Sequence, residues 1–124
     1  MDDKAKNHFN EAQKNLKGAN EELFKPKEDV VSYLVCKNSQ FAIINYLKGY
    51  LTLRGFETHE NETIDSLLGR CRSLNNKFNQ IDLKSIDCRA HNIDSKYCQD
   101  VNKVSSCFDT ADSLDTFLRK LNIL

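Results

Sequence analysis

The chain of 124 residues gives room for one domain with one hydrophobic core, spanning residues 1–124. Hydrophobic residues make up 40% and charged residues 29% of it, the balance of a soluble globular protein. The 18 basic and 18 acidic residues cancel, which argues against a highly basic nucleic-acid clamp. The N-terminal segment lacks the apolar core of a signal peptide, and no stretch suits a membrane span, so we expect a cytoplasmic protein.

The five cysteines indicate free thiols rather than a disulfide framework. Their number is odd and no secretion signal precedes them, which suits a reducing cytosol. Cys71 and Cys107 fall within apolar stripes and are expected to pack in the core as small hydrophobic residues. Cys88 and His91 have a spacing that occurs in zinc sites, but a second closely spaced pair of ligands is absent. We therefore expect no metal and no cofactor.

Residues 2–24 are predicted to form the first helix. Apolar residues recur there at spacings of three and four, at Phe9, Ala12, Leu16, Ala19 and Leu23. The only proline, Pro26, ends this helix because its ring cannot continue a helical backbone. Asp29 then suits the N-cap of the next helix, since its carboxylate can accept from the open amides of the first turn.

Residues 29–55 form the longest and most apolar run, and we predict the central helix there. Its apolar residues spread around most of a helical wheel, a distribution typical of a helix packed on several sides. The run ends at Arg54 and Gly55, both usual at a helix C-terminus. Tyr46 and Tyr50 lie one turn apart within it, and core packing is favoured over a dimer surface or a base-stacking platform.

Asn45 and Lys48 interrupt the apolar pattern of this run and lie three residues apart. If both side chains face inward they need partners, because a buried unpaired charge is very costly, and they then mark a ligand or phosphate contact. If they face the solvated edge, the Lys48 stem simply covers apolar surface. Both interpretations stay open at this point.

Two further helices are predicted, over residues 63–78 and 96–122. The first carries an apolar stripe from Ile64 through Leu74 to Phe78, and the second carries one from Tyr97 to Leu121. Residues 79–95 fit no single helical period, and a short helix or turn is favoured over a strand because no partner strand is evident. Four amphipathic helices with one short element predict an all-α, up-and-down four-helix bundle.

The stretch from Ala42 to Leu68 reads AIINYLKGYLTLRGFETHENETIDSLL and resembles the core of HEPN domains. The resemblance rests on a Leu-Lys-Gly-Tyr-Leu segment at residues 47–51, a short loop containing Gly55, then His59, then a Leu-rich helix. It is best over residues 30–75 and implies a four- or five-helix bundle, often a homodimer. HEPN domains include metal-independent ribonucleases of toxin–antitoxin systems, partners of small nucleotidyltransferases, and non-catalytic modules proposed to bind nucleotides or other proteins.

The ribonucleases of the family carry an arginine followed four to six residues later by a histidine, usually near the start of the last helix. Such an arginine can hold a phosphate bidentately, and such a histidine can transfer a proton near neutral pH. No histidine follows His91, so the last helix of this chain lacks the pair. Arg54 and His59 have the right spacing and are the candidate catalytic residues. The alternative is a helix-terminal cation and a loop histidine.

Arg89 and His91 are too close together for this motif. With Lys84 and Lys96 they could still line a phosphate site, and a solvated connector is the alternative.

We therefore expect a HEPN-like binding or partner module without catalytic activity. Its ligand is expected to be a nucleotide or RNA, or its partner a nucleotidyltransferase-type protein, and the family resemblance adds a homodimer. The alternatives are a toxin-type ribonuclease and a bundle that binds only other proteins. The candidate ligand-binding residues are Asn45, Lys48, Arg54, His59, Arg89 and His91.

Overall fold

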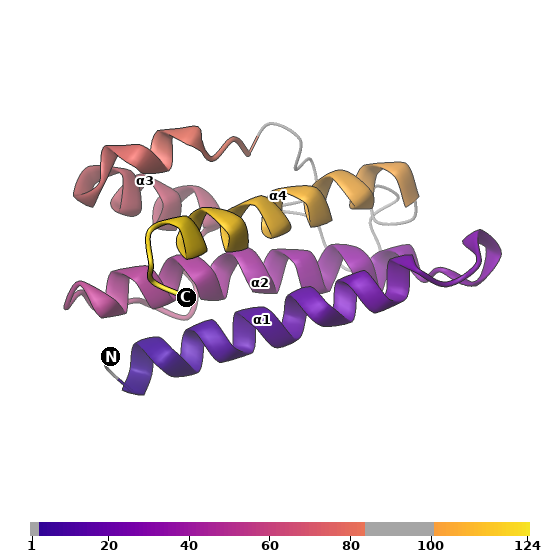
Figure 1. Ribbon diagram of the computed structural model, residues 1–124, viewed down its shortest axis with the longest axis horizontal. Coiled ribbons are helices and arrows are strands. Elements are labelled where there is room, and N and C mark those ends of the chain that lie inside the picture. The colour runs from indigo at the N-terminus through magenta and orange to yellow at the C-terminus, as the bar shows by residue number, and fades with distance from the viewer. Residues whose placement is uncertain (1–2, 84–100) are drawn as a thin grey trace.

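The computed structural model describes residues 3–83 and 101–124, and the regular structure within these ranges is entirely helical. In chain order the elements are α1 (Asp3–Leu23), η1 (Lys27–Asp29), α2 (Ser32–Leu53), α3 (Ile64–Leu74), η2 (Asn76–Gln80) and α4 (Val101–Lys120), where η marks a short 3-10 helix. α1 runs antiparallel to α2, and α4 runs in the same direction as α2 (Figure 1). The prediction of an all-α four-helix bundle is confirmed. The short additional element was predicted at residues 79–95, and residues 84–95 lie outside the described ranges.

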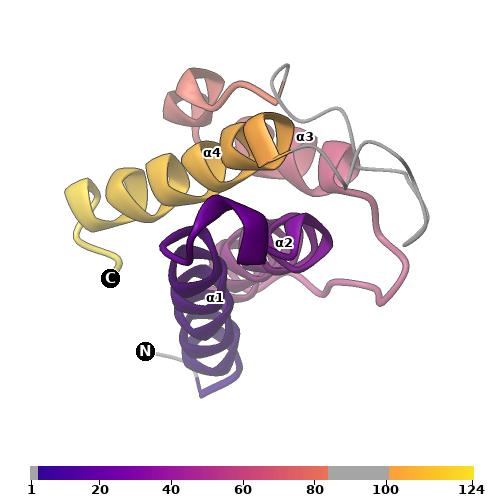
Figure 2. The ribbon, with the colours of Figure 1, turned by 90° about the vertical axis from the view of Figure 1, so that its right-hand side faces the viewer.

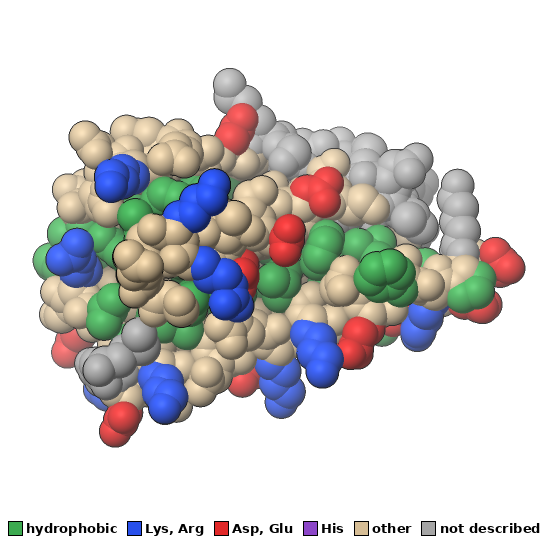
Figure 3. All heavy atoms as spheres, viewed as in Figure 1, with side chains coloured by type: hydrophobic (Ala, Val, Ile, Leu, Met, Phe, Trp, Pro, Cys, Tyr) green, Lys and Arg blue, Asp and Glu red, His purple; other side chains and the backbone are tan. Residues whose placement is uncertain are grey.

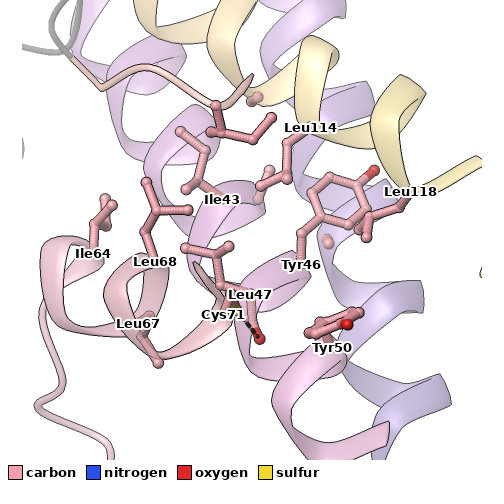
Figure 4. Packing of buried hydrophobic residues seen from close by; sticks show 14 of the residues in the cluster. Ile43, Tyr46, Leu47, Tyr50, Ile64, Leu67, Leu68, Cys71, Leu114 and Leu118 are labelled. Carbon is pink, nitrogen blue, oxygen red and sulfur yellow. Dashed lines mark hydrogen bonds between the residues drawn. The ribbon is translucent and has the colours of Figure 1, made fainter. Parts of the chain in front are cut away.

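α2 is the central helix of the bundle, as predicted. It packs against α1, α3 and α4, and the end-on view in Figure 2 shows the other helices grouped around it. Tyr46 and Tyr50 are fully buried, which confirms the expected core packing of both rings. Figure 4 shows the apolar side chains of α2 meeting those of α3 and α4, among them Ile43, Leu68 and Leu114.

The N-terminal half of α2 is less covered than the sequence predicts. Val31, Leu34 and Phe41 keep 47%, 36% and 43% of their surface exposed, although all three belong to the apolar run. α3 has only 11 residues, and its buried side chains meet the C-terminal half of α2 (Figure 4). The prediction of a helix packed on several sides is therefore correct for the C-terminal half, and the N-terminal half keeps an apolar stripe in contact with solvent.

The prediction of Asp29 as the N-cap of the central helix is wrong. Asp29 ends the short helix η1, where its amide donates to the carbonyl of Pro26 at 2.7 Å. Val31 occupies the N-cap position instead and gives no side-chain hydrogen bond. The Val31 amide donates to the carboxylate of Glu22 at 3.4 Å, so a residue of α1 stabilises the start of α2. Pro26 fixes a turn before α2. Residues 29–31, which the sequence predicted in the central helix, therefore lie outside it.

α1 and α2 approach closely where Phe9 of α1 faces Gly49 of α2. A Cβ added at Gly49 would lie 2.5 Å from Cε1 of Phe9, so no larger side chain fits there without movement. Phe9 is 2% exposed and belongs to the buried face of α1. The predicted first helix over residues 2–24 is thus confirmed, with its apolar stripe against the central helix.

The third helix is shorter than predicted. Thr63 is its N-cap, and the Thr63 hydroxyl accepts from the amide of Ser66 at 3.0 Å. The helix ends at Leu74, and the predicted continuation to Phe78 is wrong because Asn75 is extended and its side chain accepts from the amide of Lys77. An asparagine side chain that bonds to the nearby backbone competes with helical hydrogen bonds. Phe78 is nevertheless buried, and it belongs to η2 rather than to a continuation of α3.

α4 packs against α2 and is joined to it by a polar contact within the core. The hydroxyl of Tyr46 donates to Oδ2 of Asp115, and Nε of Arg119 donates to Oδ1 at 2.6 Å. Burial and the neighbouring Asp115 carboxylate raise the pKa of Tyr46 above its ordinary value, so the hydroxyl stays a donor. The predicted last helix is confirmed from Val101, and residues 96–100 lie outside the described ranges.

Three cysteines lie in the described ranges, and all are buried. Cys71 and Cys107 pack in the core as predicted, and Cys36 joins them. Burial raises the pKa of Cys71 to about 12, and its thiol faces the carbonyl of Leu47 at 3.7 Å (Figure 4). Such a thiol carries almost no thiolate near neutral pH and is chemically quiet.

Among the helices of the described residues, none is long and apolar enough to cross a bilayer.

Candidate ligand-binding cleft

An open cleft of about 530 Å³ lies where the start of α1 meets the end of α2. We call it the end cleft. Side chains of the two helices form one wall, and the loop that follows α2 forms the other. The lining residues are Lys4, His8, Lys48, Thr52, Gly55, Phe56, Glu57, Thr58 and Glu60.

The helical wall is basic, and Lys48 is its central residue. Lys48 is half-buried and lies one turn before Thr52, which also lines the cleft. Lys4 and His8 are one turn apart on α1, so both reach the cleft from the same face of that helix. The sequence left two placements open for Lys48, and its side chain lies at the solvated edge with access to a concave site.

A chain of hydrogen bonds orients the histidine of this wall. Nδ2 of Asn45 donates to Oδ1 of Asn15 at 3.1 Å, which leaves Oδ1 of Asn45 to accept. Nδ1 of His8 lies 3.4 Å from that oxygen and is its donor. Asn45 itself does not line the cleft. It holds His8 through Nδ1 of the ring, and Nε2 is the ring nitrogen that Asn45 does not use.

The loop wall is fixed by Glu62 and Arg70, which we call the loop clasp. Nη1 of Arg70 donates to both carboxylate oxygens of Glu62, at 2.7 and 2.8 Å. Nη2 of Arg70 donates to the carbonyl of Glu57 at 2.7 Å. The amide of His59 also donates to Glu62, at 3.1 Å. The backbone of the loop is therefore tied to Glu62 and to Arg70 of α3.

The two walls carry opposite charges. Lys4 and Lys48 lie on the helical side, and Glu57 and Glu60 lie on the loop side. The formal charges of these four residues cancel. On the face drawn in Figure 3, basic and acidic side chains both lie along α1 and do not form one basic patch. The cleft is suited to a ligand that has both an anionic end and a hydrogen-bond-donating end.

Arg54 and His59, the candidate catalytic pair, lie outside the end cleft. Nε of Arg54 donates to the hydroxyl of Tyr50 at 3.2 Å, and the guanidinium stands 5.5 Å from the ring centre. Arg54 lines a separate hollow of about 300 Å³ with Leu121 and other residues, and His59 lines neither hollow. Each belongs to a different local set of contacts. Arg89 and His91 fall outside the described residues.

Several residues of the end cleft could not be identified from the sequence. Lys4 and His8 are spaced like any exposed helical pair, and Glu57 and Glu60 lie in a polar connection that shows no motif. They become neighbours of Lys48 only because α1 and α2 are antiparallel and the loop folds back along α2. The spacing of four between Lys4 and His8 was the one available signal, and it is a weak one.

The metal-ligating residues of the described ranges are dispersed. Within residues 3–83 and 101–124, no group of three or more His, Cys, Asp or Glu could hold a metal ion. The Cys88–His91 spacing lies outside those ranges.

The chain was compared with protein-family models, with curated proteins and with solved structures. None of these comparisons gives a match.

Proposed function

We propose that this chain is a cytoplasmic, non-catalytic binding module of the HEPN-like type that binds a nucleotide in the end cleft. The observation that carries the proposal is the division of charge between the two walls. Lys48 and Lys4 offer ammonium groups to a phosphate, while Glu57 and Glu60 offer acceptors to the donor groups of a base. A simple polyanion would be attracted by one wall and repelled by the other.

The size and composition of the cleft agree with a single nucleotide. Small-molecule sites typically occupy about 300–1,000 Å³, and the end cleft has about 530 Å³. Phe56 adds an aromatic ring that is 46% exposed and lines the cleft, which a base can cover. The balanced charge of the chain, with 18 basic and 18 acidic residues, favours a small ligand over a long RNA strand.

The absence of catalysis is part of the proposal and is supported by the separation of Arg54 from the end cleft. Arg54 is engaged with Tyr50 and lines another hollow, whereas a ribonuclease site would need Arg54 and His59 to meet on one phosphate. The toxin-type ribonuclease therefore stays the alternative. RNA cleavage by the purified protein that is lost on His59→Ala would favour it over the binding module.

A homodimer is the assembly that the family resemblance implies, and the exposed stripe of Val31, Leu34 and Phe41 is the surface we propose for it. The formal net charge of zero means that two copies do not repel each other at long range. Light scattering tests this directly. A particle of twice 14.3 kDa supports the dimer, and one of 14.3 kDa favours a different occupant, such as a nucleotidyltransferase-type partner.

The binding proposal is tested by titrating each nucleoside monophosphate into wild type, Lys48→Ala and Lys37→Ala. Lys37 is the matched control because it lies on the exposed side of the same helix, away from the cleft. Loss of a hydrogen bond from a charged group costs about 1.5–3 kcal/mol, so Lys48→Ala should weaken binding roughly 10- to 100-fold. Calorimetry should give the same affinity for Lys37→Ala as for wild type.

Thermal unfolding gives a second reading of the same proposal. A ligand at about 100 times its dissociation constant should raise the midpoint by roughly 10 °C in wild type. The proposal fails if no nucleotide binds, or if Lys37→Ala weakens binding as much as Lys48→Ala does.

A further inference from the structure

We propose that the end cleft selects guanine among the bases and that Glu57 is the residue that reads it. This inference rests on the proposed function, because it names the nucleotide that the same cleft takes. Its observations are a carboxylate on the loop wall, a rigid backbone beneath that carboxylate, and an exposed aromatic ring next to it in the chain.

The backbone on both sides of Glu57 is held in place. The amide of Phe56 donates to the carbonyl of Leu51 at 2.9 Å, which fixes the turn after α2. The carbonyl of Glu57 itself accepts from Nη2 of Arg70 at 2.7 Å. Arg70 is in turn fixed by its two hydrogen bonds to Glu62. The backbone from which the Glu57 side chain extends is therefore preorganised, which lowers the entropy lost on binding.

Glu60 is the other carboxylate of the loop wall. It lies in an exposed turn that the Glu62 amide closes by donating to the carbonyl of His59 at 3.2 Å. Glu57 differs from it by following Phe56 directly in the chain, so its carboxylate starts beside the aromatic ring that lines the cleft. We therefore assign base recognition to Glu57 and leave Glu60 as a contributor to the negative charge of the wall.

A carboxylate discriminates among the bases through their Watson–Crick edges. Guanine alone presents two adjacent N–H donors, N1–H and N2–H, at the separation of the two oxygens of a carboxylate. Adenine and cytosine each place an acceptor nitrogen beside their amino group, so one carboxylate oxygen would face a lone pair. Uracil has a single N–H between two carbonyl oxygens. A Glu57 carboxylate is thus complementary to guanine and mismatched to the other three bases.

Phe56 and the helical wall account for the rest of the nucleotide. The Phe56 ring is an apolar surface on which any base can stack, so it adds affinity without selecting among bases. Lys48, Lys4 and His8 lie on the helical wall and receive the phosphate. The cleft volume of about 530 Å³ accommodates both ends of a nucleoside monophosphate at once.

The test is isothermal titration of GMP, IMP, AMP, CMP, UMP and ribose 5-phosphate into wild-type protein. GMP should bind on the order of 10- to 100-fold more tightly than AMP, CMP or UMP, as expected for one bidentate pair. IMP is the sharpest probe because it keeps N1–H and lacks the 2-amino group. It should bind roughly tenfold more weakly than GMP.

Two variants then connect the preference to one side chain. Glu57→Gln should lower the affinity for GMP to that for AMP. An amide keeps one acceptor oxygen, but its NH2 group replaces the other and would face an N–H donor of guanine. Glu28→Gln is the matched control, since Glu28 is an exposed glutamate in η1 near the other ends of α1 and α2. It should keep the full preference.

The outcomes separate this inference from the proposed function. Equal binding of the four nucleoside monophosphates overturns guanine selection and leaves the nucleotide cleft intact. A preference for GMP that survives Glu57→Gln, or equal binding of GMP and IMP, overturns the role of Glu57. Failure of every nucleotide to bind wild type overturns the proposed function itself.

Discussion

Two carboxylates of similar burial, Asp115 and Glu62, each bind an arginine, and they hold different parts of the molecule. The Asp115 side chain is 11% exposed and contacts Arg119 at 2.6 Å, and the Glu62 side chain is 10% exposed and contacts Arg70 at 2.7 Å. Asp115 also accepts from Tyr46, which is 69 residues away in the chain. Glu62 bonds to partners no more than eight residues away.

The difference shows that burial and a charged partner do not by themselves tell what a carboxylate stabilises. Asp115 joins α4 to the central helix, so breaking its contacts separates two parts of the core. Glu62 joins a loop to the helix that follows it, so breaking its contacts frees the loop and leaves the core packed. We expect the first to govern global stability and the second to govern the shape of the end cleft.

The largest effect is expected from Asp115→Ala. The variant leaves the buried hydroxyl of Tyr46 without an acceptor, while Arg119 can turn to water because 56% of its side chain is exposed. We expect a loss of about 2–3 kcal/mol in unfolding free energy, which lowers the thermal midpoint by roughly 10 °C. Thermal unfolding followed by circular dichroism measures it. Tyr46→Phe is the control. It removes the hydroxyl instead of its acceptor, so no buried donor is left unpaired and the loss of unfolding free energy should be smaller.

Two glycines extend this comparison. Gly49 lies at a contact between two helices, and Gly69 lies away from any such contact. Gly49→Ala brings a Cβ to 2.5 Å from Phe9, so α1 and α2 must shift apart. We expect a loss of about 1–3 kcal/mol. Gly69→Ala adds a Cβ with nothing within 4 Å, and better helix propensity should stabilise α3 by up to about 1 kcal/mol. Chemical denaturation reads both, and equal effects of the two changes would contradict the close approach.

The sequence was sufficient to predict the helices and most of the core, because both follow from the spacing of apolar residues. The three- and four-residue spacing placed α1 and α4, and the long apolar run placed α2. The errors fall at the helix ends, at Asp29 and Asn75, where one turn competes with another for the same backbone groups. Leu74 is the last residue of α3 and keeps 38% of its surface exposed, although the sequence placed it in the apolar stripe of that helix.

The candidate site was predictable only at Lys48. That residue stood out because it interrupts an apolar helix, and it does line the end cleft. Lys4, His8 and Glu57 carry no local pattern, since their proximity comes from the antiparallel arrangement of α1 and α2 and from a loop shaped by Arg70. Asp115 falls on the polar side of the last helix in the sequence pattern, yet it is buried. Its partner Tyr46 is distant in sequence, and no periodicity reports a contact of that kind.

The smallest effect on stability, and the most local one, is expected from Glu62→Gln. Burial alone would raise the pKa of Glu62, but hydrogen bonds from Arg70 and the His59 amide hold it below the ordinary value of 4.5. A carboxylate with a lowered pKa stabilises the folded state above pH 4.5, and the contribution is lost as the pH falls through the folded-state pKa.

At pH 7 the variant should therefore lose about 1 kcal/mol, and below that folded-state pKa it should unfold at the same temperature as wild type. Hydrogen exchange of the His59 amide locates the effect, because this amide donates to Glu62 and should exchange faster in the variant at pH 7. Amides in the middle of α2 should keep their protection. A variant that loses protection along α2 to the same degree would show that the loop clasp supports the core, and the distinction between Glu62 and Asp115 would then fail.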